Sequence, residues 1–395
     1  MKKEKILLFT LTALNFTHIM DFMIMMPLGS YLMPLFKLSP SQFSMIVSSY
    51  TFSAGISGFF VAFFADRFDR KNILMLGYAG FIASTFVCGF SDSYGMLLGS
   101  RIVAGCFGGF IGSQVLSIIA DMIPFERRAS AMGTLMSGFS FASVAGVPLG
   151  LFLASLAGWG TPFIFIGIMG LIVILLIYRF IPEMKEHIIR DEKKKNPFGV
   201  ITNILSDRNQ LRGLLLTVAM MLGHFSIIPF IASYMEFNVG FSKMQITYIY
   251  LFGGIASLIS APLIGKLADK IGKLKTLSFF IIGSTFPVLC ITNMPHMPFY
   301  YALIPTTLFF VFAGGRLIPA QAMISAIVKP ERRGGFMSIN SALQQLASGS
   351  AALIAGSIIT KESSGILMNY QYVGFIGIAV SLSCLLIAKK LKPIA

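Results

Sequence analysis

Twelve apolar stretches, each long enough to cross a lipid bilayer as an α-helix, dominate the sequence. A membrane helix needs about 20 predominantly apolar residues to cross a hydrocarbon core of about 30 Å. The predicted helices cover residues 6–34, 42–64, 73–91, 95–120, 130–157, 162–181, 211–236, 244–267, 276–293, 299–327, 336–359 and 368–388. Hydrophobic residues make up 55% of the chain and charged residues only 12%, about half of the usual share in a soluble domain. The sequence therefore predicts an all-α membrane protein.

The N-terminal segment resembles a secretory signal peptide, because Lys2, Lys3 and Lys5 precede an apolar run. This run continues past Asp21 to about Leu35 without a small-residue cleavage site. We therefore expect the segment to be retained as the first membrane helix.

The lysine and arginine residues indicate how the helices are oriented, because positively charged loops stay on the cytoplasmic side of a membrane. An even number of helices places both termini on the same side. Most of the 31 lysine and arginine residues fall near the termini or in loops on that side, whereas only Lys37, Lys243 and Lys361 fall in loops on the other. The sequence predicts a multi-pass protein of the cell (inner) membrane with both termini in the cytoplasm.

The predicted helices divide into two halves of six. The only long hydrophilic connection predicts a cytoplasmic linker, residues 183–210, between an N-terminal bundle (1–182) and a C-terminal bundle (211–395). Two charged loops recur in the second half: Asp66-Arg67-Phe68-Asp69-Arg70-Lys71 corresponds to Asp269-Lys270-Ile271-Gly272-Lys273, and Glu126-Arg127-Arg128 corresponds to Glu331-Arg332-Arg333. Such a repeat is typical of transporters built from two pseudo-symmetric bundles, with the substrate site between the bundles near the middle of the membrane.

At these motifs the chain resembles the major facilitator superfamily, specifically its bacterial drug or metabolite:proton antiporters. The family's loop between the second and third helices, Gly-x-x-x-Asp-Arg-x-Gly-Arg-Arg/Lys, is matched except at its glycines, where Ala62 and Asp69 stand instead. Arg101 with Gly105 is similar to the family's fourth-helix motif. The fifth-helix antiporter motif, Gly-x-x-x-Gly-Pro-x-x-Gly-Gly, is matched only loosely, by Gly146-Val147-Pro148-Leu149-Gly150.

The resemblance implies that the loop charges act as a conformational latch on the cytoplasmic side. The residues concerned are Asp66, Arg67 and Arg70 in the first half and Asp269 and Lys270 in the second. An aspartate near the N-terminus of a neighbouring helix is stabilised by the helix dipole and by free amides. The alternative is that the basic residues only anchor the topology.

Ionisable residues inside the predicted spans are few, and such residues are functional candidates because burial in a bilayer is costly. From a rise of 1.5 Å per residue, Asp21 lies about 24 Å and Arg101 about 30 Å from the cytoplasmic helix end, and His18, His224 and Arg316 lie about 18 to 20 Å from it. The resemblance implies that their helices, the first, fourth, seventh and tenth, line the central pathway.

Asp21 and Arg101 are the candidates for proton coupling. Burial favours the protonated form of a carboxyl group and a nearby guanidinium favours the charged form, so a change in their separation would change the proton affinity of Asp21. The alternative is a static ion pair that fixes two helices.

Arg316, His18 and His224 are the candidates for substrate binding. No acid lies at the level of Arg316 on its own helix, and a substrate carboxylate or phosphate would compensate its charge. The alternatives are a pair with Asp21 or with backbone carbonyls for Arg316, and a proton relay or a structural role for the two histidines.

Small and polar residues at helical spacing predict helix packing. Gly105-x-x-x-Gly109 would let two helices approach closely. Asn340, Gln344 and Gln345 would either meet substrate or form hydrogen bonds between helices.

We expect proton-driven export of a small amphiphilic compound by alternating access, from a monomer surrounded by lipid. One acid and two arginines within the spans favour neutral, zwitterionic or acidic substrates. The alternatives are proton-linked uptake of a nutrient or siderophore, and a non-transporting membrane receptor.

Other functions lack their sequence signatures. The formal charge of +15 is spread over short loops, which argues against a nucleic-acid partner. The sequence has no membrane-embedded His-Glu-x-x-His and no Gly-x-x-x-x-Gly-Lys-Ser/Thr, so we expect neither an enzyme nor ATP drive, and no cofactor. The four cysteines lie in apolar stretches without metal-ligand spacing, so we expect no metal site.

Overall fold

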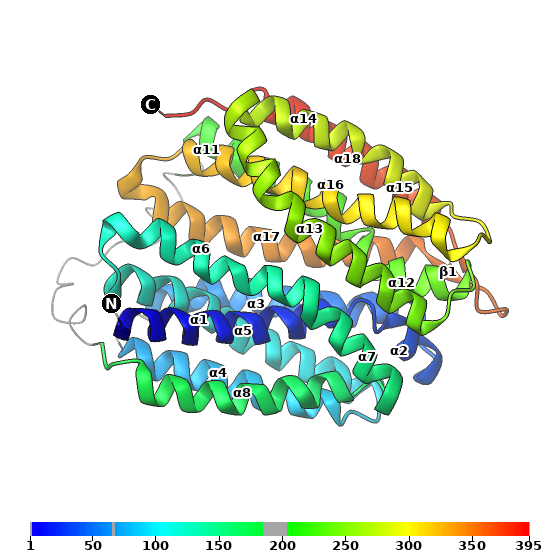
Figure 1. The fold of residues 1–395 in the computed structure, drawn as a ribbon, viewed down its shortest axis with the longest axis horizontal. Helices are drawn as coiled ribbons and strands as arrows, with labels where there is room; N and C mark the ends of the chain where they lie inside the picture. The colour runs from blue at the N-terminus through cyan, green and yellow to red at the C-terminus, as the bar shows by residue number, and fades with distance from the viewer. Residues whose placement is uncertain (1, 65–67, 185–203, 205, 395) are drawn as a thin grey trace. The chain divides into compact units, whose positions relative to one another are not determined.

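The computed structural model describes residues 2–64, 68–184, 204 and 206–394, which are almost entirely helical (Figure 1). The chain forms two compact units. The first unit comprises Met1–Met25 and Ser49–Lys195, and the second comprises Met26–Ser48 and Asn196–Ala395. Most of the predicted linker, residues 185–203 and 205, lies outside the described residues.

The first unit is a bundle of long helices. Its elements are α1 (Lys2–Ile24), residues 49–64 of α3 (Pro40–Phe64), α4 (Arg70–Gly89), α5 (Tyr94–Met122), α6 (Phe125–Phe141), the π-helical turn η2 (Ala142–Gly146), α7 (Val147–Ala157) and α8 (Thr161–Phe180). Helices α4 and α8 run side by side in Figure 1. Leu11, Phe81, Ile118 and Ile177 form part of the core between α1, α4, α5 and α8. Leu175 is 67% exposed, as expected for a helix that is apolar on all sides and faces lipid.

Glycines let α5 pack directly against α3. A Cβ atom at Gly105 would lie 2.1 Å from Oγ of Ser53 and 2.3 Å from the backbone oxygen of Tyr50. A Cβ atom at Gly109 would lie 2.1 Å from Oγ of Ser57. The close packing predicted from the Gly105-x-x-x-Gly109 spacing is therefore confirmed.

Gly105→Ala is expected to destabilise the protein by about 1 to 3 kcal/mol, because the added methyl group would overlap the backbone of α3. Gly99→Ala in the same helix is the matched control, because nothing lies within 4 Å of its added Cβ and alanine is the better helix former. The measurement is the unfolding midpoint of the purified variants in detergent. Equal midpoints for the two variants would contradict the packing.

The second unit contains ten helices or parts of helices among the described residues and one short hairpin. The helices are α2 (Gly29–Leu35), residues 40–48 of α3, α11 (Arg208–Phe225), α12 (Ile228–Phe237), α13 (Lys243–Ile271), α14 (Lys273–Gly283), α15 (Thr285–Thr292), α16 (Phe299–Ala326), α17 (Pro330–Ile358) and α18 (Tyr370–Ala388). The antiparallel hairpin joins β1 (Thr360–Lys361) to β2 (Leu367–Met368), with Thr360 opposite Met368. Leu216, Ile324, Phe336 and Cys384 form part of the core between α11, α16, α17 and α18.

Residues 26–48 pack on elements from the C-terminal part of the chain. The rings of Phe43 and Phe230 meet edge to face with their centroids 5.8 Å apart, which joins α3 to α12. A Cβ atom at Gly356 would lie 2.1 Å from Oγ of Ser44, so α17 touches the start of α3. One continuous helix, α3, therefore belongs to the second unit over its first turns and to the first unit over the remainder.

Three predicted helices are interrupted. The predicted helix over 6–34 is too long, because α1 ends at Ile24 before α2. The predicted spans 211–236 and 276–293 fall within the apolar stretches Arg208–Phe237 and Lys273–Thr292, but each contains a break, between α11 and α12 and between α14 and α15. Pro27, Pro229 and Pro287 stand at or just after these breaks. Proline lacks an amide hydrogen, and its ring clashes with the carbonyl four residues earlier, so a helix ends near that position.

Eleven helical stretches among the described residues are long and apolar enough to cross a membrane, compared with the twelve predicted. Helix α17 occupies the position of the remaining predicted span, 336–359, but is rich in serine and glycine and also contains Asn340, Gln344 and Gln345. Oδ1 of its buried Asn340 accepts a hydrogen bond of 2.6 Å from Oγ1 of Thr217 on α11. The polar character of α17 is thus used in part for contacts between helices.

Candidate functional site

Asp21 and Arg101 form an ion pair inside the first unit. Nη1 of Arg101 donates to Oδ2 of Asp21 at 2.7 Å, and the two side chains are 1% and 0% exposed. Oγ1 of Thr85 donates to Oδ1 of Asp21 at 3.2 Å, so both carboxylate oxygens have a donor. The pair joins α1 to α5, and Thr85 adds a contact from α4.

Aromatic rings enclose the guanidinium of Arg101. Its Cζ atom lies 4.5 Å from the ring centroid of Tyr50 and 5.8 Å from that of Phe163. Its Nε atom is buried and has no hydrogen-bond partner among the described residues. Cation–π contacts and the carboxylate stabilise the charge together, although one donor is left unsatisfied.

His18 is connected to this pair through Tyr50. The Tyr50 hydroxyl and Nε2 of His18 are 2.8 Å apart, and the imidazole also meets the edge of Phe81 at a centroid distance of 5.3 Å. A Cβ atom at Gly108 would lie 2.8 Å from Nε2 of His18, so glycine leaves space for this hydrogen bond. The structure therefore brings together His18, Asp21 and Arg101 through one tyrosine.

Sequence reasoning missed Tyr50 and Thr85. Both are polar side chains within predicted spans, 42–64 and 73–91, and this was the only available signal. Neither is ionisable in the usual range of a proton carrier, so neither stood out from the many serines and threonines in the helices. Only the packing of α3 and α4 against α1 and α5 identifies them.

Arg316 lies buried in the second unit, 3% exposed, without a carboxylate partner among the described residues. Nη1 donates to Oγ of Ser381 at 3.1 Å, and Nη2 stands 3.5 Å from Nδ1 of His224. Nε has no hydrogen-bond partner among the residues that the structure describes. The guanidinium charge is therefore uncompensated by protein in the part of the chain described.

The ring of His224 is held between aromatic side chains. It stacks on Phe309 with a centroid distance of 6.0 Å and an interplanar angle of 10°, and it meets Phe225 edge to face at 5.2 Å. His224 on α11, Arg316 on α16 and Ser381 on α18 thus form one buried polar cluster. The described residues contain no group of three or more His, Cys, Asp or Glu side chains that could hold a metal ion.

The predicted latch residues have different surroundings. Asp66 and Arg67 lie outside the described residues. Nε of Arg70 donates to Oδ2 of Asp121, which connects the start of α4 to the end of α5. Asp269 and Lys270 are exposed at the end of α13, and no side-chain partner is present for them in the described parts of the chain.

Asp69, which was not a predicted site residue, holds the start of α4. Its Oδ1 atom accepts hydrogen bonds from the backbone amides of Lys71 at 2.8 Å and Asn72 at 3.2 Å, which caps the helix. Its Oδ2 atom accepts from the amide of Met184 at 2.9 Å, after the end of α8. The family pattern has glycine at this position, so the motif gave no reason to select it.

Buried charges in membrane helices, one paired and one without an acid, are typical of membrane proteins that move substrates or ions. The chain matches the family model described as Major Facilitator Superfamily over residues 11–315 and 213–394. The chain belongs to the major facilitator superfamily. It is a multi-pass membrane transporter of small molecules, and this membership implies that it is not an enzyme.

Known relatives agree with this membership, and a solved structure agrees with the fold. The chain is 24% identical to the uncharacterised MFS-type transporter YceJ of Bacillus subtilis (strain 168), over 93% of this chain and 90% of the relative. It is also 24% identical to a probable sugar efflux transporter of Helicobacter acinonychis (strain Sheeba), over 89% of this chain and 86% of the relative. The structure of a D-xylose–proton symporter matches with a TM-score of 0.78 at 18% identity, over 99% of both chains.

Proposed function

We propose that this transporter exports a small organic compound by proton-coupled alternating access. Asp21 takes and releases the proton, and Arg101 controls its proton affinity. The observation that carries the proposal is the buried contact between Asp21 and Arg101, in which each carboxylate oxygen has one donor.

The chemistry of this contact suits coupling. A carboxylate beside a guanidinium in a low-dielectric site remains charged, whereas one that loses the guanidinium binds a proton. Thr85 stays able to hydrogen-bond either form, because a hydroxyl can donate or accept. If α1 moved relative to α5, Asp21 would therefore lose its contact with Arg101 and bind a proton instead.

The cluster around Arg316 supports an acidic, zwitterionic or neutral polar substrate. Its guanidinium has no carboxylate partner among the described residues, and a substrate carboxylate or phosphate would pair with it. His224 and Ser381 would add hydrogen bonds to the same group, and His18 would serve the equivalent role in the first unit. The relatives named as probable sugar efflux transporters support export rather than uptake.

The remaining parts of the proposal concern topology and conformational control. The basic loops favour the inner membrane with both termini in the cytoplasm. The repeated charged loops favour two six-helix bundles (1–182 and 211–395) joined by a linker. Arg70, with Asp121, is proposed to hold the cytoplasmic ends of α4 and α5 in one state, together with Asp66 and Arg67. Asp269 and Lys270 would do the same in the second half.

The test uses everted membrane vesicles with an acidic interior and a pH-sensitive dye. The vesicles are challenged with sugars, carboxylic acids, zwitterions and lipophilic cations. Wild type is expected to release protons when its substrate is added, and Asp21→Asn is expected to lose this response. Asp92→Asn, which removes an exposed acid, is the matched control and is expected to behave as wild type.

The outcomes separate the parts of the proposal. Proton release from Asp21→Asn at the wild-type level would remove Asp21 from coupling. Silence of the wild-type protein with every compound, together with proton-linked accumulation in right-side-out vesicles, would replace export by uptake.

A further inference from the structure

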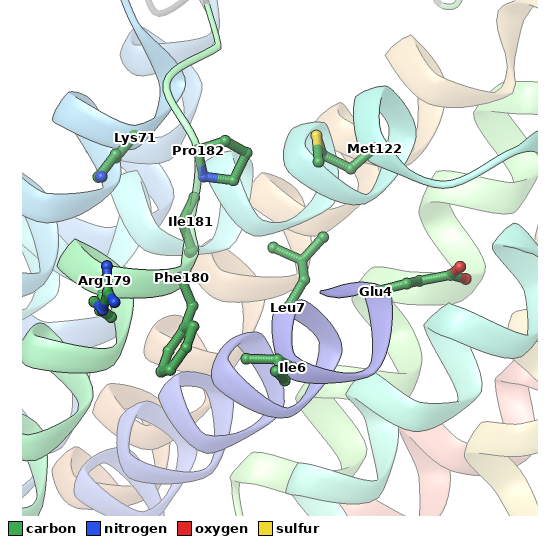
Figure 2. A pocket seen from close by; sticks show the side chains of 9 residues that line it. All are labelled: Glu4, Ile6, Leu7, Lys71, Met122, Arg179, Phe180, Ile181 and Pro182. Atoms are coloured by element: carbon green, nitrogen blue, oxygen red, sulfur yellow. The ribbon is translucent and has the colours of Figure 1, made fainter. Parts of the chain in front are cut away.

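A pocket opens at one end of the first unit, where α1, α4 and α5 meet the end of α8 and the residues that follow it. Its volume is about 760 Å³. Ile6, Leu7 and Phe180 form part of an apolar wall, and Glu4, Lys71 and Arg179 bring charges (Figure 2). In Figure 2, Lys71 and Arg179 lie on one side of the pocket and Glu4 on the other.

The pocket has an excess of positive charge. The carboxylate of Glu4 is paired with Nη1 of Arg127 at 2.8 Å. Nζ of Lys71 donates to the backbone oxygen of Tyr178 at 2.8 Å and lies 5.4 Å from the centroid of the Tyr178 ring, but neither contact supplies a negative charge. The side chain of Arg179 has no partner among the described residues. Two cations are thus available to an anion, and the single acid is already neutralised.

The position of the pocket favours a lipid. Its residues lie at the ends of helices that cross the membrane, on the side of the basic loops. The cytoplasmic leaflet carries anionic lipids, and basic pockets between membrane helices on this side bind their headgroups. A free phosphate ion would use the two cations but not the apolar wall, whereas a phospholipid would use both.

We propose that this pocket binds one anionic phospholipid of the leaflet at this end of the helices. The phosphate lies between Lys71 and Arg179, and the glycerol and upper acyl chain run along Ile6, Leu7 and Phe180. A volume of about 760 Å³ is within the usual range for small-ligand pockets, so it holds a headgroup with part of a chain rather than a whole lipid. The proposal depends on the membrane-spanning fold and not on the direction or substrate of transport.

The test is native mass spectrometry of the detergent-purified full chain, titrated with phosphatidylglycerol or with phosphatidylcholine of the same acyl chains. Wild type is expected to bind one phosphatidylglycerol more tightly than phosphatidylcholine. The double variant Lys71→Gln with Arg179→Gln is expected to bind phosphatidylglycerol about 25-fold more weakly, at about a fivefold loss for each basic residue near a lipid surface.

Two controls keep the proposal falsifiable. Lys389→Gln with Lys390→Gln removes two exposed positive charges elsewhere and is expected to leave binding unchanged. Arg179→Gln alone alters only an exposed side chain, which avoids any loss of the Lys71 contact with α8. Equal affinity for the two lipids, unchanged binding by the double variant, or complete competition by inorganic phosphate would overturn the proposal.

Discussion

Arg101→Met is expected to lower the stability of the protein by about 3 to 5 kcal/mol, because Asp21 is then left buried without its partner and must either keep an uncompensated charge or take up a proton. The side chain of Asp21 is 0% exposed, and the hydroxyl of Thr85 alone would remain to stabilise its carboxylate. The measurement is the unfolding free energy or midpoint in detergent, with Arg127→Met as the matched control, because its ion pair with Glu4 is largely exposed on the arginine side.

The double variant Asp21→Leu with Arg101→Met is expected to recover most of this loss. Replacing both members of a buried ion pair by apolar residues is often neutral for stability or even stabilising. The recovered variant should still fail to couple transport to protons. A double variant as unstable as Arg101→Met alone would show that the arginine stabilises the bundle through its contacts with Tyr50 and Phe163 rather than through Asp21.

Unlike Arg101→Met, Arg316→Met is not expected to lower the stability of the protein, but it is expected to have a large effect on transport. Its guanidinium has no acid partner among the described residues, so an apolar side chain of similar length should leave the unfolding midpoint unchanged or raise it. Export of an acidic substrate should fall about 100-fold, since loss of one buried charge pair costs about 2 to 5 kcal/mol of binding.

The measurement for Arg316 compares the best acidic compound of the vesicle panel with its neutral amide. Wild type should prefer the acid, and Arg316→Met should lose this preference. Arg316→Lys, which keeps the charge but not the planar guanidinium, should retain part of the acid export. A strongly destabilised Arg316→Met, or an unchanged preference for the acid, would show that Arg316 has a structural partner instead of a substrate.

The charged part of the site could be predicted from the sequence because charges are rare in membrane helices. The estimated heights of Asp21 and Arg101 placed them within reach of each other, and the structure joins them at 2.7 Å. The roles of these residues remain predictions. Tyr50 and Thr85 could not be selected, because uncharged polar groups become part of a site only through the packing of separate helices.

The fold was predictable to a similar degree. Hydropathy locates the membrane helices because the bilayer sets their length, but it does not detect a proline break within an apolar run, as at Pro27 and Pro229. Helix α17 is rich in serine and glycine, yet the sequence still predicted a helix over 336–359. Residues 26–48 belong to the second unit because of contacts between distant parts of the chain, and no local sequence pattern encodes such contacts.

The segment 26–48 has a consequence for how the protein is made. Ser44 is synthesised long before Gly356, and Phe43 long before Phe230, yet each packs against the later residue. Contacts between residues so far apart in sequence form slowly because the chain between them must first be ordered. During synthesis, the first turns of α3 therefore lack part of their packing partners until α17 has been made. In an N-terminal fragment that ends in the linker, Phe43 and Ser44 would lack these partners altogether.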